Sequence, residues 1–393
     1  MFKLFKSNNG LLALMFFEVF LLPVWHLGPI SFKFSFLVII YSFRKKIPKS
    51  SFILPFLPLI ILLWFGKFYS YLFLGEYEFQ QTIKITLNYF VIIGVFLYSK
   101  KIKIPNNLNW IALLALAYSF VNICVFILAP KYPSIMSFYN LETRVEEGLF
   151  LFRNPGINTN PNGSALMGNL ILLFWVVANN NNLITLKSKF WDIIVFASIG
   201  LAIVSFVSKS GFLAYFILCV FYFRKKFSIL KLFKATVPVI IVAFLISNFI
   251  KQLPKNELRV LEFGIDKIVN FDEALESEIN LDQSQNGSRI FKVNAAIENF
   301  ITSPVFGSGS DRSSRSVLNT VWYHNDFSEI LVSTGLLGFL FYLLIVYRIF
   351  KIDYILTLPI FLPGLTNSFI FTFQIAAFYF LFVGLILKLK NIK

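Results

Sequence analysis

Long apolar runs separated by short polar connections are the dominant pattern of the chain. Lipid offers no water to backbone N–H and C=O groups, so spanning segments are helices of about 20 apolar residues or closed barrels. The uninterrupted apolar runs exclude a barrel. We therefore expect an all-α polytopic membrane protein with about 12 transmembrane helices, at residues 11–28, 30–43, 51–66, 82–99, 110–129, 163–178, 190–207, 211–223, 232–250, 327–350, 353–366 and 369–387.

The composition agrees with an integral membrane protein. Hydrophobic residues make up 57% of the 393 residues and charged residues only 14%, whereas soluble domains have about 25% charged residues. The net charge is +16, and the basic residues lie between apolar runs and not along one polar face. This distribution argues against a soluble nucleic-acid binder. Cys124 and Cys219 both lie in apolar runs, so we expect neither a disulfide framework nor a thiolate metal site.

The distribution of Lys and Arg predicts the orientation, because basic residues are enriched in cytoplasmic connections. With a cytoplasmic N-terminus, 21 of the 36 Lys and Arg residues fall on the cytoplasmic side. The other 15 fall outside, with 17 of the 20 acids. This orientation places both termini in the cytoplasm.

The outer connections are long, whereas the inner ones are short and basic. Two of the long outer connections are residues 67–81 and 130–162. The third, residues 251–326, is a loop of 76 residues. Long loops on one face are usually functional. We expect three regions: nine transmembrane helices in 1–250, a large outer loop with the functional motifs in 251–326, and three further helices in 327–393.

The large outer loop contains a predicted amphipathic helix from Arg289 to Thr302. Ser288 is a suitable N-cap and Pro304 ends the run. The apolar side chains recur at helical spacing, so this helix should lie along the membrane surface or over the bundle. Arg289 at the first position and the helix N-terminus would both favour a phosphate, although an ordinary interfacial arginine is the alternative.

His324 is one of only two histidines and lies immediately before the predicted tenth span. Asp326 and Glu329 have the spacing of a helix N-cap and its capping-box partner, which places His324 just outside the membrane. A neutral imidazole there could take a proton from a sugar hydroxyl. The alternative is an interfacial histidine that hydrogen-bonds to loop backbone.

Lys209 lies in the tight outer turn Ser208-Lys209-Ser210-Gly211 between the predicted seventh and eighth spans. A positive charge held close to the bilayer is costly without an anionic partner. Lys209 is therefore a candidate for binding an anion, and snorkelling of its side chain to the surface is the alternative.

Other polar residues of the outer connections are candidates for binding substrate. Arg153 belongs to Arg153-Asn154-Pro155-Gly156, and Asn162 belongs to Asn160-Pro161-Asn162-Gly163. Proline and glycine at this density indicate rigid turns, in which the asparagines could serve only as caps. The remaining candidates are Arg312, Arg315 and Asn325.

Several motifs are missing from the sequence. No acidic DxD pair or Cys/His cluster is present to hold a divalent metal, and no P-loop or Rossmann fingerprint is present. We therefore expect no metal and no cofactor. The same absences indicate that the donor of a transfer reaction is neither a nucleotide sugar nor ATP.

Taken in order along the chain, these motifs resemble those of the O-antigen ligase and polysaccharide polymerase superfamily. The resemblance rests on the segments around Arg153 and Asn162, on the turn at Lys209, and on Gly287-Ser288-Arg289 followed by residues 303–309. It continues through His324-Asn325 to Gly335-Leu336-Leu337-Gly338. The first 130 residues resemble the family only in their number of predicted spans.

The resemblance implies a C-class glycosyltransferase of the bacterial inner membrane, which works on the periplasmic face without metal and inverts the anomeric carbon. It implies that Arg289 holds the lipid diphosphate and that His324 activates the acceptor hydroxyl. Lys209 stands where the family usually has an arginine. Bidentate binding of diphosphate at this position is therefore in doubt, because lysine offers a point charge and not a fork.

Three functions are compatible with these features. A polymerase would transfer the glycan from undecaprenyl diphosphate to a second lipid-linked glycan, and we favour it because the Phe-, Ile-, Lys- and Asn-rich composition is typical of surface-polysaccharide clusters. A ligase would transfer the glycan to lipid A-core. The third is a lipid-linked oligosaccharide transporter, but such proteins place charges at the midplane between related halves, and here Glu18 is the only acid well inside a predicted span.

The expected partners follow from these functions. They are the undecaprenyl-diphosphate-linked glycan, the acceptor glycan lipid or lipid A-core, and the bilayer. A chain-length regulator protein is a further candidate partner, and no nucleic acid is expected.

Overall fold

The computed structural model describes residues 8–23, 25–27, 30–44, 47–74, 79–103, 107–128, 132–139, 156–157, 161–186, 189–206, 208–223, 289–309, 326–361 and 373–392. The predicted ninth span and most of the large outer loop therefore lie outside the described residues. The same holds for the candidate residues Arg153, Arg312, Arg315, His324 and Asn325.

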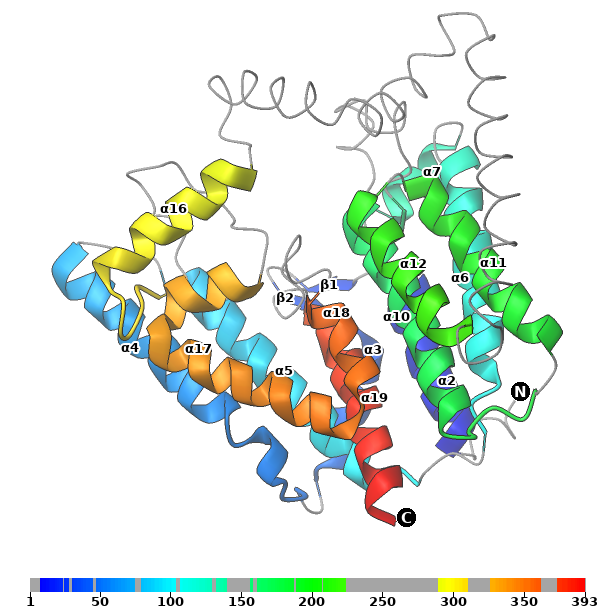
Figure 1. Ribbon diagram of the computed structural model, residues 1–393, viewed down its shortest axis with the longest axis horizontal. Coiled ribbons are helices and arrows are strands. Elements are labelled where there is room, and N and C mark those ends of the chain that lie inside the picture. The colour runs from blue at the N-terminus through cyan, green and yellow to red at the C-terminus, as the bar shows by residue number, and fades with distance from the viewer. Residues whose placement is uncertain are drawn as a thin grey trace, which may run out of the picture. The chain divides into compact units, whose positions relative to one another are not determined.

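The described residues are predominantly helical, as expected (Figure 1). Two three-residue strands, β1 (Trp25–Leu27) and β2 (Ile30–Phe32), form an antiparallel hairpin in which Trp25 pairs with Phe32. The helices are α2 (Asn8–Leu21), α3 (Phe34–Ser42), η1 (Ser51–Ile53), α4 (Phe56–Leu74), α5 (Gln80–Lys101), α6 (Trp110–Leu128), α7 (Pro133–Phe138), α10 (Pro161–Asn180), α11 (Lys189–Phe206), α12 (Lys209–Phe223), α16 (Arg289–Thr302), α17 (Asp326–Ile352), η3 (Tyr354–Thr357), α18 (Leu358–Phe361) and α19 (Phe373–Ile392).

The chain divides into two compact units, which we describe separately. Unit 1 consists of residues 1–111, 177–185 and 286–393, and unit 2 consists of residues 112–176 and 186–285.

Helix α19 is the buried centre of unit 1, and it packs along α5. Aromatic rings fill this core, as the 50 phenylalanines of the chain suggest. Phe378 of α19 meets Phe16 of α2 edge to face, with ring centroids 5.1 Å apart, and Phe380 meets Phe56 of α4 at 5.5 Å. Such pairs add about 0.5–1.5 kcal/mol beyond the area that they bury.

In unit 2, a buried carboxylate links three helices. Asp192 on α11 accepts hydrogen bonds from Trp175 Nε1 on α10, at 3.0 Å, and from the Tyr222 hydroxyl on α12, at 2.5 Å. These bonds satisfy a charge that would otherwise be costly inside an apolar bundle.

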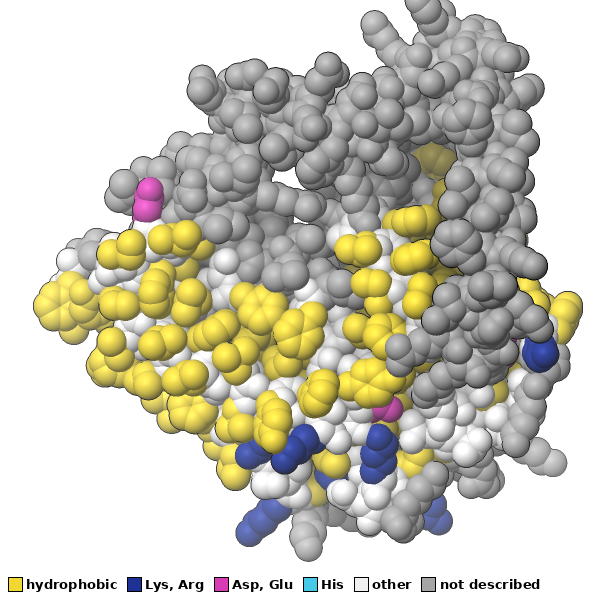
Figure 2. All heavy atoms as spheres, viewed as in Figure 1, with side chains coloured by type: hydrophobic (Ala, Val, Ile, Leu, Met, Phe, Trp, Pro, Cys, Tyr) yellow, Lys and Arg dark blue, Asp and Glu magenta, His cyan; other side chains and the backbone are white. Residues whose placement is uncertain are grey.

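The protein is a membrane protein by the length and composition of its helices. Five helical segments are long and apolar enough to cross a membrane: Ser51–Phe73, Thr82–Lys101, Asn162–Asn180, Lys189–Phe206 and Asp326–Ile352. On α4, exposed side chains follow a helical stripe of Leu57, Ile61, Phe65, Phe68 and Leu72. Figure 2 shows a broad hydrophobic surface where α4 and α17 lie, with basic side chains gathered along one edge.

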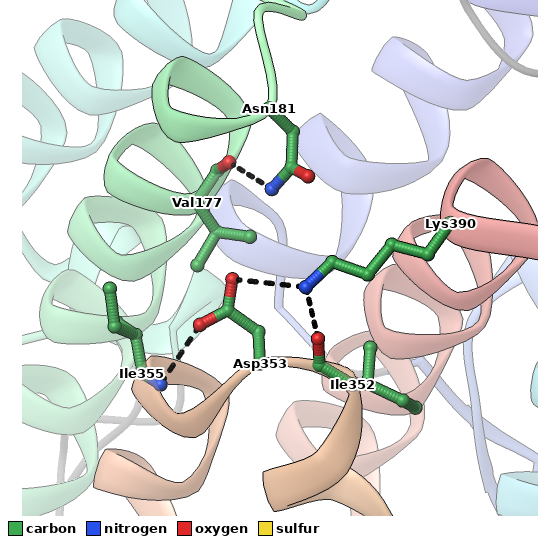
Figure 3. A network of polar contacts seen from close by, with 6 residues as sticks. All are labelled: Val177, Asn181, Ile352, Asp353, Ile355 and Lys390. Atoms are coloured by element: carbon green, nitrogen blue, oxygen red, sulfur yellow. Dashed lines mark hydrogen bonds and ion pairs between the residues drawn. The ribbon is translucent and has the colours of Figure 1, made fainter. Parts of the chain in front are cut away.

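Three parallel helices of unit 1 end at this basic edge. Lys388 of α19 donates to the carbonyls of Lys100 and Ile102 at the end of α5, at 2.9 and 2.7 Å. Lys390 donates to the carbonyl of Ile352 at the end of α17 and lies 3.8 Å from the Asp353 carboxylate (Figure 3). Basic side chains at helix C-termini satisfy the last carbonyls and complement the helix dipole.

Some predicted span boundaries differ from the helices in the structure. The first predicted span, 11–28, contains a helix only as far as Leu21, because Pro23 lacks the N–H that a continuing helix needs. The second, 30–43, contains β2 and the nine-residue α3. The third, 51–66, continues in α4 as far as Leu74. In the eleventh, 353–366, the described residues form η3 and the short α18.

Glu18, the acid inside the first predicted span, joins the ends of two helices. Its carboxylate accepts from the backbone N–H groups of Phe34 and Ser35, at 2.6 and 2.8 Å, and so caps the N-terminus of α3. In the opposite direction, Lys33 donates to the carbonyls of Leu22 and Pro23 after the end of α2. Glu18 is thus held by a structural contact between the end of α2 and the start of α3.

We expect Glu18→Gln to weaken this pair of caps, because the amide has one acceptor oxygen where the carboxylate has two charged ones. The loss should be about 1–2 kcal/mol of stability. Thermal unfolding of the detergent-purified protein should therefore show a lower Tm. Glu298→Gln, which changes an exposed acid on α16, is the matched control and should leave the Tm unchanged. Equal Tm values for the Glu18 variant and the wild type would contradict the capping role.

Candidate active site

Helix α17 is interrupted at Gly335, and the loop 303–309 pairs with the interruption. Gly335 has φ +66° and ψ −170°, which breaks the helical hydrogen-bond ladder. The N–H groups of Ser308 and Gly309 donate to the carbonyls of Val332 and Ser333, at 2.9 and 3.0 Å. The loop thereby satisfies carbonyls that would otherwise be unpaired in an apolar region.

The loop also satisfies the second half of α17. Leu336 N and Leu337 N donate to the carbonyls of Pro304 and Val305, at 2.9 and 3.3 Å. Within the loop, Ser303 Oγ donates to the carbonyl of Gly307 at 2.8 Å. The loop is therefore bonded to α17 on both sides of the break.

Four glycines permit this close approach. A Cβ on Gly66 of α4 would lie 2.7 Å from Gly309 N and 3.0 Å from Ser333 O, and a Cβ on Gly335 would lie 2.6 Å from Gly307 N. Gly307 and Gly309 themselves have φ of +75° and +76°. Larger residues would separate the loop from α4 and from α17.

Helix α16 begins at Arg289 and ends at Thr302, as predicted from the sequence. It packs on the N-terminal part of α17 through Ala296, Phe300 and Val332. Ile297 and Ile301 on the same helix are exposed, which suits a helix at a membrane surface. Arg289 occupies the first helical position, where the helix N-terminus favours an anion.

In unit 2, the turn with Lys209 and the segment with Asn162 lie together. Ser208 precedes α12, and its hydroxyl accepts from Gly211 N at 3.2 Å, which is an N-cap bond. The same hydroxyl donates to Asn162 Oδ1, at 2.8 Å, in the first turn of α10. The N-termini of α10 and α12 are therefore adjacent, and Lys209 is the first residue of α12.

The segment that follows Arg153 joins the same end of unit 2. Gly156, with φ +67°, contacts the Ser164 side chain of α10. Next to it, Ile157 N donates to Asn122 Oδ1 on α6 at 3.0 Å. Asn162 and Gly156 thus have structural contacts as well as the binding role proposed for their segments.

The predicted site residues fall into both units. Arg289 belongs to unit 1, whereas Lys209 and Asn162 belong to unit 2. Among the residues that the structure describes, no group of three or more His, Cys, Asp or Glu side chains could hold a metal.

Three buried charged residues of unit 1 had no functional role in the sequence-based prediction. Lys67 of α4 was placed in an outer connection, but it lies within an apolar helix and is fully buried. Asp326 was predicted as the N-cap, yet α17 begins at Asp326 itself, and both Asp326 and Glu329 are buried. The signal in the sequence was a lysine inside a longer apolar run, from Phe56 to Leu74.

Gly335→Ala should destabilise the protein, because this φ and ψ combination is essentially restricted to glycine and costs other residues about 1–3 kcal/mol. The new Cβ would also collide with the carbonyl of Val305. We expect a lower Tm in detergent. Gly94→Ala in α5 is the control, because the nearest atom to its new Cβ would be 3.9 Å away. A Gly335 variant that melts with the wild type would show that the break is not required.

Residues 193–343 match the family model described as O-antigen ligase, a range that runs from α11 to α17 and includes Lys209, Arg289 and His324. Searches of curated proteins and of solved structures find no match. The match covers 151 of the 393 residues and agrees with the resemblance drawn from the motifs: this part of the chain is similar to the O-antigen ligase family.

Proposed function

We propose that the protein is an O-antigen or surface-polysaccharide polymerase. It transfers a glycan from undecaprenyl diphosphate to a hydroxyl of an acceptor lipid-linked glycan on the periplasmic face of the inner membrane. The family match supports glycosyltransferase-like activity on lipid-linked glycans. The observation that carries the proposal is the end of unit 2 where the N-termini of α10 and α12 meet beside Lys209.

The adjacent helix N-termini are suited to a diphosphate. Each helix N-terminus carries a partial positive charge and backbone N–H groups that favour anions. Lys209 adds a full charge at the N-terminus of α12, in unit 2. Arg289, at the N-terminus of α16 in unit 1, is the residue that the resemblance assigns to the diphosphate. Lysine is a compact point charge, so we assign Lys209 to charge neutralisation and the forked contact to Arg289.

The reaction is a single displacement with inversion and without metal. His324 takes the proton of the attacking sugar hydroxyl, whose oxygen forms a bond to the anomeric carbon. The bond between that carbon and the diphosphate oxygen breaks, and undecaprenyl diphosphate leaves with the electron pair. Arg289 and Lys209 stabilise the negative charge as it develops. Arg153, Asn162, Asn325, Arg312 and Arg315 are proposed to bind the substrates.

We further propose a topology of about 12 spans with both termini in the cytoplasm. The parallel helices α5, α17 and α19 support it, because their C-termini meet at an edge rich in lysine. In this topology the large loop 251–326 is periplasmic. A chain-length regulator is proposed as a partner on the same face.

The ligase is the second candidate, because the matching family model is described as O-antigen ligase. The donor and the catalytic residues would be the same, and lipid A-core would be the acceptor.

Substitution of the proposed catalytic residues should abolish long-chain product while the protein still inserts. His324→Ala, Arg289→Ala and Lys209→Met should each lower the transfer rate by about 10²–10³-fold, since each removes a transition-state interaction. The glycan ladder of a complemented deletion strain measures this effect. His26→Ala, which changes the other histidine, in β1, should keep the wild-type ladder. Wild-type ladders with His324→Ala or Arg289→Ala would refute the assignment.

Deletion of the gene separates the two acceptors. Loss of a polymerase should leave single repeat units attached to the lipid A-core, whereas loss of a ligase should leave a core with nothing attached. A lipopolysaccharide gel of the deletion strain distinguishes these outcomes. Bare core would overturn the polymerase proposal in favour of the ligase.

A further inference from the structure

Basic side chains gather at the ends of α5 and α19 in unit 1, along the border of the hydrophobic surface (Figure 2). Lys100 and Lys101 are the last residues of α5, and Lys388 and Lys390 lie near the end of α19. Among the described residues, the one ion pair that these four side chains make joins Lys390 to Asp353, 3.8 Å apart. The edge therefore carries an excess of positive charge.

The length of α5 places this edge at the depth of lipid headgroups. Its segment Thr82–Lys101 is apolar enough to cross a membrane, and its 20 residues span about 30 Å, the thickness of the hydrocarbon core. Lysines at this level keep their stems against apolar side chains and their ammonium groups near the headgroups. Accordingly, Lys100 Nζ lies 5.8 Å from the centre of the Phe96 ring, and Lys101 Nζ lies 5.0 Å from that of Phe43.

Lys100 and Lys388 form the centre of this edge, because their positive charges lie close together. Lys388 Nζ donates to the carbonyls of Lys100 and Ile102, at 2.9 and 2.7 Å, and its ammonium is within electrostatic range of the Lys100 ammonium. Both side chains are partly buried, and neither pairs with a carboxylate of the described residues. Two like charges in partly apolar surroundings repel each other, and an anion beside them would offset the repulsion.

The ammonium groups of this edge have hydrogen-bond donors available for an anion. Each ammonium has three N–H donors. Lys388 uses two of them on the carbonyls at the end of α5, and Lys101 uses one on the carbonyl of Ser42, the last residue of α3. No described residue accepts a hydrogen bond from Lys100 Nζ. The remaining donors suit the oxygens of a phosphate group.

Apolar side chains beside the lysines indicate that the phosphate belongs to a lipid. Ile40 and Tyr41 immediately precede Ser42, whose carbonyl Lys101 binds, and they are 67% and 62% exposed. A free phosphate ion would contact only the lysines. A phospholipid offers its phosphate to the lysines and its acyl chains to the exposed apolar side chains at the same time.

We propose that the ends of α3, α5 and α19 form a binding site for an anionic phospholipid. Lys100, Lys101 and Lys388 surround its phosphate, and the exposed apolar side chains of α3 contact its acyl chains. Binding joins the ends of α5 and α19 and thereby stabilises unit 1. No residue of the proposed glycosyl transfer takes part, so the site does not depend on that proposal.

The site is tested by titrating lipid into the full-length protein, delipidated in a neutral detergent, and by measuring the Tm. Phosphatidylglycerol should raise the Tm at concentrations at which phosphatidylcholine with the same acyl chains does not, because a ligand that binds the folded state stabilises it. The midpoint of the rise gives the apparent affinity. Lys100→Met should weaken the affinity for phosphatidylglycerol about 5-fold, and the double variant Lys100→Met with Lys388→Met about 25-fold.

Two further variants separate the site from general charge and from folding. Lys84→Met removes the same charge from an exposed lysine near the start of α5, and it should keep the wild-type affinity. Lys100→Arg keeps the positive charge and should bind phosphatidylglycerol as the wild type does. Both variants at position 100 remain informative if Lys388→Met, which also removes two bonds to the end of α5, does not fold.

Four results would overturn the proposal. They are equal Tm rises with phosphatidylglycerol and phosphatidylcholine, a wild-type affinity in Lys100→Met, an equal loss of affinity in Lys84→Met, and an equal Tm rise with inorganic phosphate at the same concentration. The third result would indicate a response to net charge, and the fourth a site for free phosphate.

Discussion

The backbone of the interrupted helix α17 must be hydrogen-bonded inside the protein, because the helix lies in an apolar region without water. The loop 303–309 meets this requirement with four backbone bonds, two on each side of Gly335. Glycines at 66, 307 and 309 allow the loop to lie directly against α4 and α17. The arrangement of α4, α16 and the first half of α17 depends on this one contact.

This contact also fixes the two described segments that flank the proposed base in the sequence. The loop 303–309 follows α16, whose first residue is Arg289, and the first half of α17 directly follows His324-Asn325. Fixing the loop against α17 therefore constrains the chain on both sides of the proposed base. In unit 2, Ser208 joins α10 to α12 by side-chain hydrogen bonds in a comparable way.

The sequence predicted local features well, because their signals are local. Helix α16 has the predicted bounds, Arg289–Thr302, because Pro304 and the helical spacing of apolar residues are signals in the local sequence. Features set by distant contacts were not predictable. The spacing of apolar residues along the sequence does not show that Lys67 is buried, or that Gly335 adopts a positive φ where the loop 303–309 meets α17. Pro23 did carry a signal for the early end of α2, and the length of the apolar run obscured it.

The most direct measurement is transfer by the purified protein in detergent, supplied with undecaprenyl-diphosphate-linked glycan only. If the protein is a polymerase, the lipid-linked glycans should become longer without added metal or nucleotide. One undecaprenyl diphosphate should be released for each glycosidic bond formed. Absence of any transfer, from a protein that moves the same lipid-linked glycan across liposomes, would contradict the assignment as a glycosyltransferase.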